Sequence, residues 1–99
     1  MNFEVNTPCA SYFVTPKWGT YRVNGRTSLE LIDVHDGELV MVATVNLTDE
    51  RINEDELIIK NYSENEGVLE SLQKAEIVGP VLRTVHTGFV TASVVKRLK

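Results

Sequence analysis

The sequence predicts an α+β fold: a mostly antiparallel sheet of five or six strands, with one helix at about residues 63–76 packed on a face. Two dipeptides typical of tight hairpin turns, Asn24-Gly25 and Asp36-Gly37, separate segments in which apolar residues alternate. Apolar residues recur at helical spacing only in the segment at about residues 63–76. The last part of the chain is rich in β-branched residues and carries a turn at Thr87-Gly88, which indicates a closing hairpin.

An N-terminal meander supplies the first three strands. They are expected at residues 21–23, 27–34 and 39–47, on the two sides of each turn. In the second strand Leu29 and Leu31 share one face, and polar residues occupy the other. Both faces of the third strand are largely apolar, which predicts a central strand that is covered on both sides.

The structure of residues 1–19 stays open, because Pro8 and Pro16 each remove a backbone donor that a central strand would need. Tyr12–Val14 is compatible with a short edge strand. A length of 99 residues fits one domain spanning residues 1–99.

The helix is predicted from a start signal and from an apolar stripe. Ser63 and Glu66 fit a capping box, in which each side chain satisfies a free backbone amide. The stripe consists of Val68, Leu69, Leu72 and Ala75. Before it, residues 48–56 are predicted to form an acidic loop and Leu57–Lys60 a short strand. After it, Val81–His86 and Phe89–Val95 form the closing hairpin.

Composition excludes several classes of function. Ten basic residues against fourteen acidic ones give a net charge of -4, which argues against direct binding of nucleic acid or of an anionic membrane surface. No apolar run is long enough to span a bilayer, and the N-terminus does not resemble a signal peptide. The single Cys9 excludes an internal disulfide. We therefore expect a protein of the cytoplasm.

Acidic residues gather in the middle of the chain and form the most useful functional feature. Such a surface favours binding to a basic protein partner by charge complementarity. Two aromatic residues are candidate anchors of the contact, since aromatic side chains dominate binding energy at interfaces. The predicted partner-binding residues are Asp49, Glu50, Glu54, Asp55, Glu56 and Glu64, with Tyr62 and Trp18 as the anchors. The alternative is an ordinary acidic surface.

Groups that would support catalysis are few. Asp33, His35 and Asp36 surround a turn and could in principle ligate a metal with His86, but a polar turn explains them more simply. Cys9 has no basic neighbour in sequence that would activate it. The N-terminus of the helix could hold an anion, although its own glutamates would repel one. We predict no catalytic residue, no metal site and no cofactor.

One segment, Ile59–Leu69, is the most distinctive run of the sequence. With several shorter motifs, it resembles a family of small proteins of unknown function that occurs in bacteria, often on phages and other mobile elements. The resemblance covers about residues 20–95. The shorter motifs are Asn24-Gly25-Arg26, Leu29 to Asp33, Asp36-Gly37-Glu38, Ala43 to Leu47 and Gly88-Phe89-Val90. The resemblance carries no active site; it implies a compact protein that binds or inhibits a host factor.

These observations predict a non-enzymatic interaction protein of a phage or mobile element, which binds and inhibits a host or defence protein in the bacterial cytoplasm. The alternative is a protein that sequesters a nucleotide or metabolite, and an anionic ligand would then need Arg22, Arg26 or Arg83 nearby. A small metal-dependent enzyme is the least favoured alternative. A homodimer is compatible with each of these three functions, because a small sheet has free edges that a second copy can cover.

Overall fold

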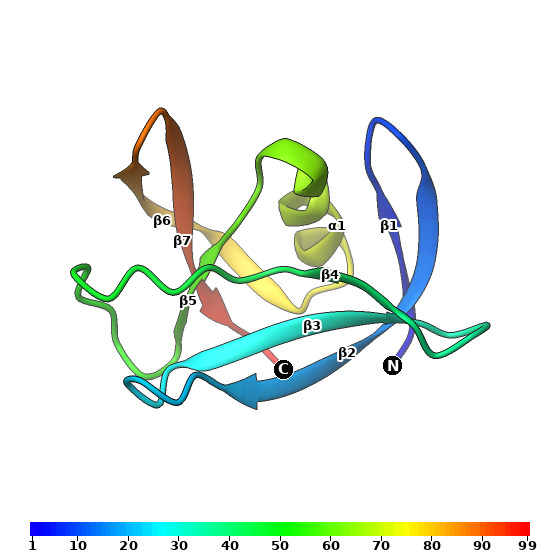
Figure 1. Ribbon diagram of the computed structural model, residues 1–99, viewed down its shortest axis with the longest axis horizontal. Helices are drawn as coiled ribbons and strands as arrows, with labels where there is room; N and C mark the ends of the chain where they lie inside the picture. The colour runs from blue at the N-terminus through cyan, green and yellow to red at the C-terminus, as the bar shows by residue number, and fades with distance from the viewer.

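Two antiparallel sheets and one α-helix make up the protein, as a computed structural model of residues 1–99 shows (Figure 1). The predicted α+β class and the predominantly antiparallel pairing are confirmed. The elements are β1 (Phe3–Asn6), β2 (Ser11–Thr20), β3 (Thr27–Asp33), β4 (Leu39–Val42), β5 (Glu56–Ile59), the 3₁₀ turn η1 (Ser63–Asn65), α1 (Val68–Lys74), β6 (Val78–Thr87) and β7 (Val90–Arg97). Its one α-helix is too short to cross a membrane.

The strands form two sheets, not the single sheet of five or six strands that the sequence predicts. The first has the order β1-β2-β3-β4 and the second the order β5-β7-β6. Residues 1–19 supply β1 and most of β2, so the two added strands come from the segment that the sequence leaves open. Pro16 is tolerated within β2 because β1 pairs with β2 only as far as Val14, which leaves the edge beside Pro16 free.

The meander differs from prediction at both of its ends. Residues 21–23 form a turn and no strand: the Tyr21 carbonyl accepts the Gly25 amide at 2.8 Å, and the strand before the turn is β2. The third predicted strand corresponds to β4, which is shorter than predicted because it ends at Val42. β4 also lies at the edge of the first sheet and not at its centre. Its two apolar faces therefore do not reflect a central strand.

The chain crosses from one sheet to the other at Ala43–Val45, which we call the seam. The Ala43 amide donates to the Leu29 carbonyl of β3 at 2.8 Å, and the Ala43 carbonyl accepts the Lys60 amide at 2.8 Å. Thr44 forms an isolated bridge with Ile59 of β5. The seam thus hydrogen-bonds to both sheets and joins them.

The main core lies between the two sheets and the helix. Buried side chains from every strand of the first sheet and from all three strands of the second contribute to it, and the helix adds Val68, Leu69 and Leu72. Figure 1 shows α1 between the two hairpins β1–β2 and β6–β7, where it packs on β1 and β6. A second, smaller cluster lies on the other face of the second sheet, with Ile58, Val85, Ala92 and Val94 buried in it.

Candidate functional site

The distinctive Ile59–Leu69 segment forms a corner that fixes the start of the helix. The Asn61 side-chain oxygen accepts the backbone amides of Gly67 at 3.1 Å and of Leu69 at 2.9 Å. The predicted capping box is therefore wrong, since Ser63 makes no capping bond and α1 begins only at Val68. Asn61 already satisfies these two amides, so they are not free to bind an anion.

The same corner connects elements that are far apart in the sequence. The Asn65 side chain is buried, and its amide nitrogen donates to the Val42 carbonyl of β4 at 2.8 Å. Ser71, in the first turns of α1, accepts the Asn6 amide of β1 at 3.1 Å. Structural bonds account for these asparagine and serine positions, and no catalytic role is needed to explain them.

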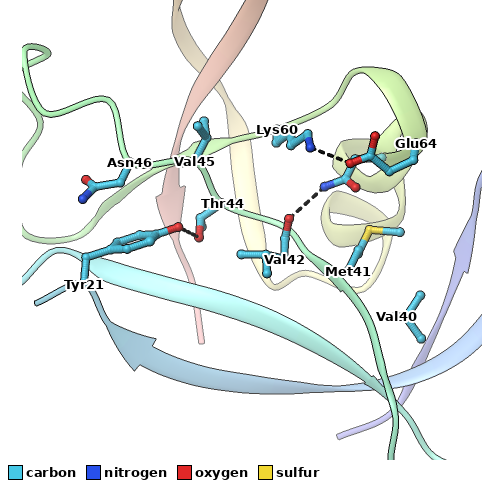
Figure 2. A pocket seen from close by; sticks show the side chains of 10 residues that line it. Tyr21, Val40, Met41, Val42, Thr44, Val45, Asn46, Lys60 and Glu64 are labelled. Carbon is cyan, nitrogen blue, oxygen red and sulfur yellow. Dashed lines mark hydrogen bonds and ion pairs between the residues drawn. The ribbon is translucent and has the colours of Figure 1, made fainter.

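A surface hollow of about 400 Å³ lies beside this corner, between the seam, β4 and η1 (Figure 2). Four of its polar side chains are paired with one another. The Tyr21 hydroxyl lies 2.8 Å from the Thr44 hydroxyl, and Lys60 binds Glu64 at 2.5 Å. The hydrogen bond and charge of Lys60 hold the pKa of the Glu64 carboxyl below its ordinary value. No fully buried side-chain nitrogen or oxygen of the protein lacks a hydrogen-bond partner, so the hollow contains no buried polar group without a partner.

The segment from Leu47 to the first residue of β5, residues 47–56, carries most of the predicted partner-binding residues and is called here the acidic loop. Two arginines hold it, one in the β2–β3 turn and one in β6. Arg26 donates to the carbonyls of Leu47 (2.8 Å) and Glu50, and Arg83 of β6 donates to the carbonyl of Arg51. Within the loop, Glu56 accepts the Asn53 amide at 2.8 Å. Two of its apolar side chains, Leu47 and Ile52, pack on the second cluster.

Several of the predicted carboxylates face basic partners. Glu50 lies 3.7 Å from Arg83, Asp55 lies 3.4 Å from Lys96, and Glu64 is paired with Lys60. Asp49 and Glu54 are the exposed carboxylates of the loop that have no basic partner within 4.0 Å. Glu64 belongs to the hollow of Figure 2 and lies outside the acidic loop.

The two aromatic candidates lie near the acidic loop and are only half-buried. Tyr62 packs against the second cluster, which the loop covers. Trp18 packs at the margin of the main core, and the Arg97 guanidinium stacks on its ring at 3.7 Å. The Arg97 amide in turn donates to the Asp55 carbonyl, which places Trp18 next to one end of the loop. A partner would have to displace Arg97 to reach the stacked face of Trp18.

Three arginines that are distant in sequence line one polar hollow of about 530 Å³ under the acidic loop: Arg26, Arg51 and Arg83. The first and third also hold the loop, whereas Arg51 is exposed and makes no side-chain hydrogen bond or ion pair. From the sequence, an anionic ligand is expected to need Arg22, Arg26 or Arg83 nearby. Arg26 and Arg83 line this hollow and Arg22 does not, and the sequence gives no signal that Arg51 joins them. Glu56 lines the same hollow and offsets part of its charge.

The reactive side chains lie in three different parts of the fold. His35 follows β3, Cys9 lies in the β1–β2 turn, and His86 is the last residue but one of β6. Asp33 and Asp36 accept the amides of His35 and Glu38, as expected for a polar turn. No three side chains of the histidine, cysteine, aspartate and glutamate types come together in a way that could hold a metal ion.

Comparison with models of protein families, with curated proteins and with solved structures finds no match to this chain. The geometry of its own residues therefore carries the functional argument.

Proposed function

We propose that the chain is a non-enzymatic protein of a phage or mobile element that binds, and thereby inhibits, a host or defence protein in the bacterial cytoplasm. The acidic loop makes the contact. The observation that carries the proposal is that Arg26 of the β2–β3 turn, Arg83 of β6 and the Glu56–Asn53 bond hold this exposed loop. A loop that is ordered before binding loses less conformational entropy when it meets its partner.

The partner on this proposal presents a basic surface, such as the nucleic-acid groove of an enzyme. Asp49 and Glu54 supply the free negative charge, and the paired carboxylates Glu50 and Asp55 directly follow them in the sequence. Complementary charges raise the association rate and make it depend on salt.

Reversing the two free charges tests this interface. In pull-downs from nuclease-treated host lysate, the wild-type chain is expected to retain a stoichiometric protein, and the double variant Asp49→Lys, Glu54→Lys is expected to lose it. An exposed charge pair contributes about 0.2–1 kcal/mol, and a reversal replaces this attraction by a repulsion of similar size. Two reversals are therefore expected to cost about 0.8–4 kcal/mol, which weakens binding by at least about fourfold. Glu56 is left unchanged because it holds the loop.

The matched control is Glu38→Lys, Glu70→Lys, which makes the same change of net charge at two exposed positions outside the loop. This control is expected to bind like the wild type. Equal loss in both double variants would mean that net charge alone matters, and undiminished binding of Asp49→Lys, Glu54→Lys would remove the loop from the interface.

A second function, binding of a small anionic ligand such as a nucleotide, is favoured by the hollow that Arg26, Arg51 and Arg83 line. In a thermal-unfolding screen with inorganic phosphate and nucleotides, a ligand at 100 times its Kd stabilises the fold by about 2.7 kcal/mol. Arg51→Gln is expected to abolish the shift without affecting the loop, while Arg22→Gln, outside the hollow, keeps it. An unchanged melting temperature with every anion argues against this function.

A further inference from the structure

β6 is an outer strand of the second sheet, and half of its free edge has no protection. On the other side β6 pairs with β7, with Arg83 opposite Val94, Val85 opposite Ala92 and Thr87 opposite Val90. Backbone groups of successive residues in a strand point to opposite sides. In β7 the amide of Arg97 donates toward β5, so the odd-numbered residues face β5. The even-numbered residues Val94, Ala92 and Val90 therefore face β6. It follows that Thr84 and His86 direct their N–H and C=O groups outward.

The first part of this edge is closed and the second part is open. The Gln73 side chain donates to the Gly79 carbonyl at 3.2 Å, and Pro80 has no N–H to offer. No backbone or side-chain hydrogen bond outside the sheet involves the outward groups of Thr84 and His86. Proteins usually protect such an edge against pairing with another strand. In β6 the protection continues to the β-bulge between Val81 and Arg83, and it stops before Thr84.

Exposed apolar side chains accompany the open edge. Phe89, at the tip of the hairpin, is 109% exposed, and Leu82 and Val81 are 53% and 42% exposed. The turn needs a glycine at position 88, where φ is +64°, but nothing in its geometry needs a phenylalanine at position 89. Within the single chain, Phe89 therefore exposes a large apolar surface that the fold does not use.

We propose that a second copy of this chain pairs with the open edge, antiparallel and about a two-fold axis at Val85. In this register Thr84 of each copy lies opposite His86 of the other, and the four outward N–H and four outward C=O groups lie where backbone bonds form. The second sheets of the two copies become one continuous sheet of order β5-β7-β6-β6-β7-β5.

The same register explains the apolar residues, and this is the argument for a second copy. Because the two copies run antiparallel, the hairpin tip that carries Phe89 in one copy lies toward the end of the other copy's open edge, where Val81 and Leu82 lie at a β-bulge. Arg83 lies opposite Thr87, so no like charges oppose each other across the axis. One symmetric contact thus pairs the free backbone groups and covers the exposed apolar side chains at both ends.

Molecular mass measured by sedimentation over a series of concentrations tests this dimer. The wild-type chain is expected to pass from monomer to dimer, and Phe89→Ser is expected to raise the dissociation constant by about tenfold or more. Val23→Ser, which removes an 80% exposed apolar side chain from another turn, is the matched control and leaves the mass unchanged. The double variant Asp49→Lys, Glu54→Lys also leaves it unchanged, so this test is independent of the proposed function.

A second variant and a direct readout complete the test. Thr84→Pro removes an outward N–H, leaves the ladder with β7 intact and is expected to give a monomer with an unchanged circular dichroism spectrum. In the wild type, hydrogen exchange at the amides of Thr84 and His86 is expected to slow as concentration rises, whether or not the proline variant folds. A monomer at every concentration, or a dimer in which these two amides exchange freely, would overturn the proposal.

Discussion

Gly67→Ala is expected to lower the free energy of unfolding by about 3 kcal/mol or more, because strain and a backbone clash act together at this position. Gly67 precedes α1 with φ at +97°, a region that residues with a Cβ rarely adopt. A Cβ at this position would lie 2.2 Å from the Asn6 carbonyl oxygen of β1. Either β1 or the helix must move, and each contributes buried side chains to the main core.

Gly25→Ala is the matched control, since Gly25 also has a positive φ, at +71°, but no atom lies within 4 Å of the added Cβ. It isolates the conformational strain, which is expected to cost about 1–2 kcal/mol. Urea unfolding followed by circular dichroism measures both variants. Equal losses in the two would show that the close approach of β1 to the helix start contributes nothing.

Local signals in the sequence predict the turns and the strands that flank them. Asp36-Gly37 and Thr87-Gly88 form turns with positive φ at both glycines, as their residue types require. The sequence predicts the helix in the correct segment but with the wrong start. Asn61 caps the helix from a distance, because it accepts the amides of Gly67 and Leu69, six and eight residues later in the chain. A capping box is a pattern of residues three positions apart in the sequence. It therefore cannot predict a cap by a side chain that reaches the helix from the other side of a turn.

The division into two sheets has no local signal. Residues 39–47 alternate like one strand, but they belong to β4 at one end and to the seam at the other. The switch occurs where Ala43 bonds to Leu29 on one side and Lys60 on the other, and both contacts join distant parts of the chain. The same limit applies to residues 1–19, because the tolerance of Pro16 depends on where β1 ends.

For the candidate site, the sequence identifies the acidic loop but not its anchors. The concentration of acidic residues in the sequence identifies residues 49–56 as an acidic segment. Arg26 and Arg83, however, reach the loop only after both sheets have formed. The sequence also contains the Gly88-Phe89 pair, and a two-residue turn with glycine first indicates an exposed residue after it. Phe89 lies beside an open strand edge because the second sheet has the order β5-β7-β6. The residues of the hairpin alone do not predict this order.

Thr44→Val is expected to lower the free energy of unfolding by about 2 kcal/mol, although the two side chains have nearly the same shape. The Thr44 hydroxyl is buried in the seam, where it accepts the Leu29 amide at 3.2 Å and lies 2.8 Å from the Tyr21 hydroxyl. Valine leaves the Leu29 amide without a partner in a place that water does not reach, because Leu29 is fully buried. A side chain thus completes the edge of β3 where the chain leaves the first sheet.

Two companion variants separate the buried amide from the rest of the network. Thr44→Ser keeps the hydroxyl and is expected to lose about 1 kcal/mol for the missing methyl group, and Tyr21→Phe is expected to lose no more than about 1 kcal/mol. Because Tyr21 and Leu29 share one hydroxyl, Tyr21→Phe combined with Thr44→Val should cost less than the sum of the two single changes. Urea unfolding gives the four free energies, and hydrogen exchange at the Leu29 amide should accelerate in Thr44→Val alone among the single variants. Strict additivity, or a Leu29 amide that stays equally protected, would mean that β4 and the first sheet hold the edge without the threonine, and that the seam joins the sheets through backbone bonds only.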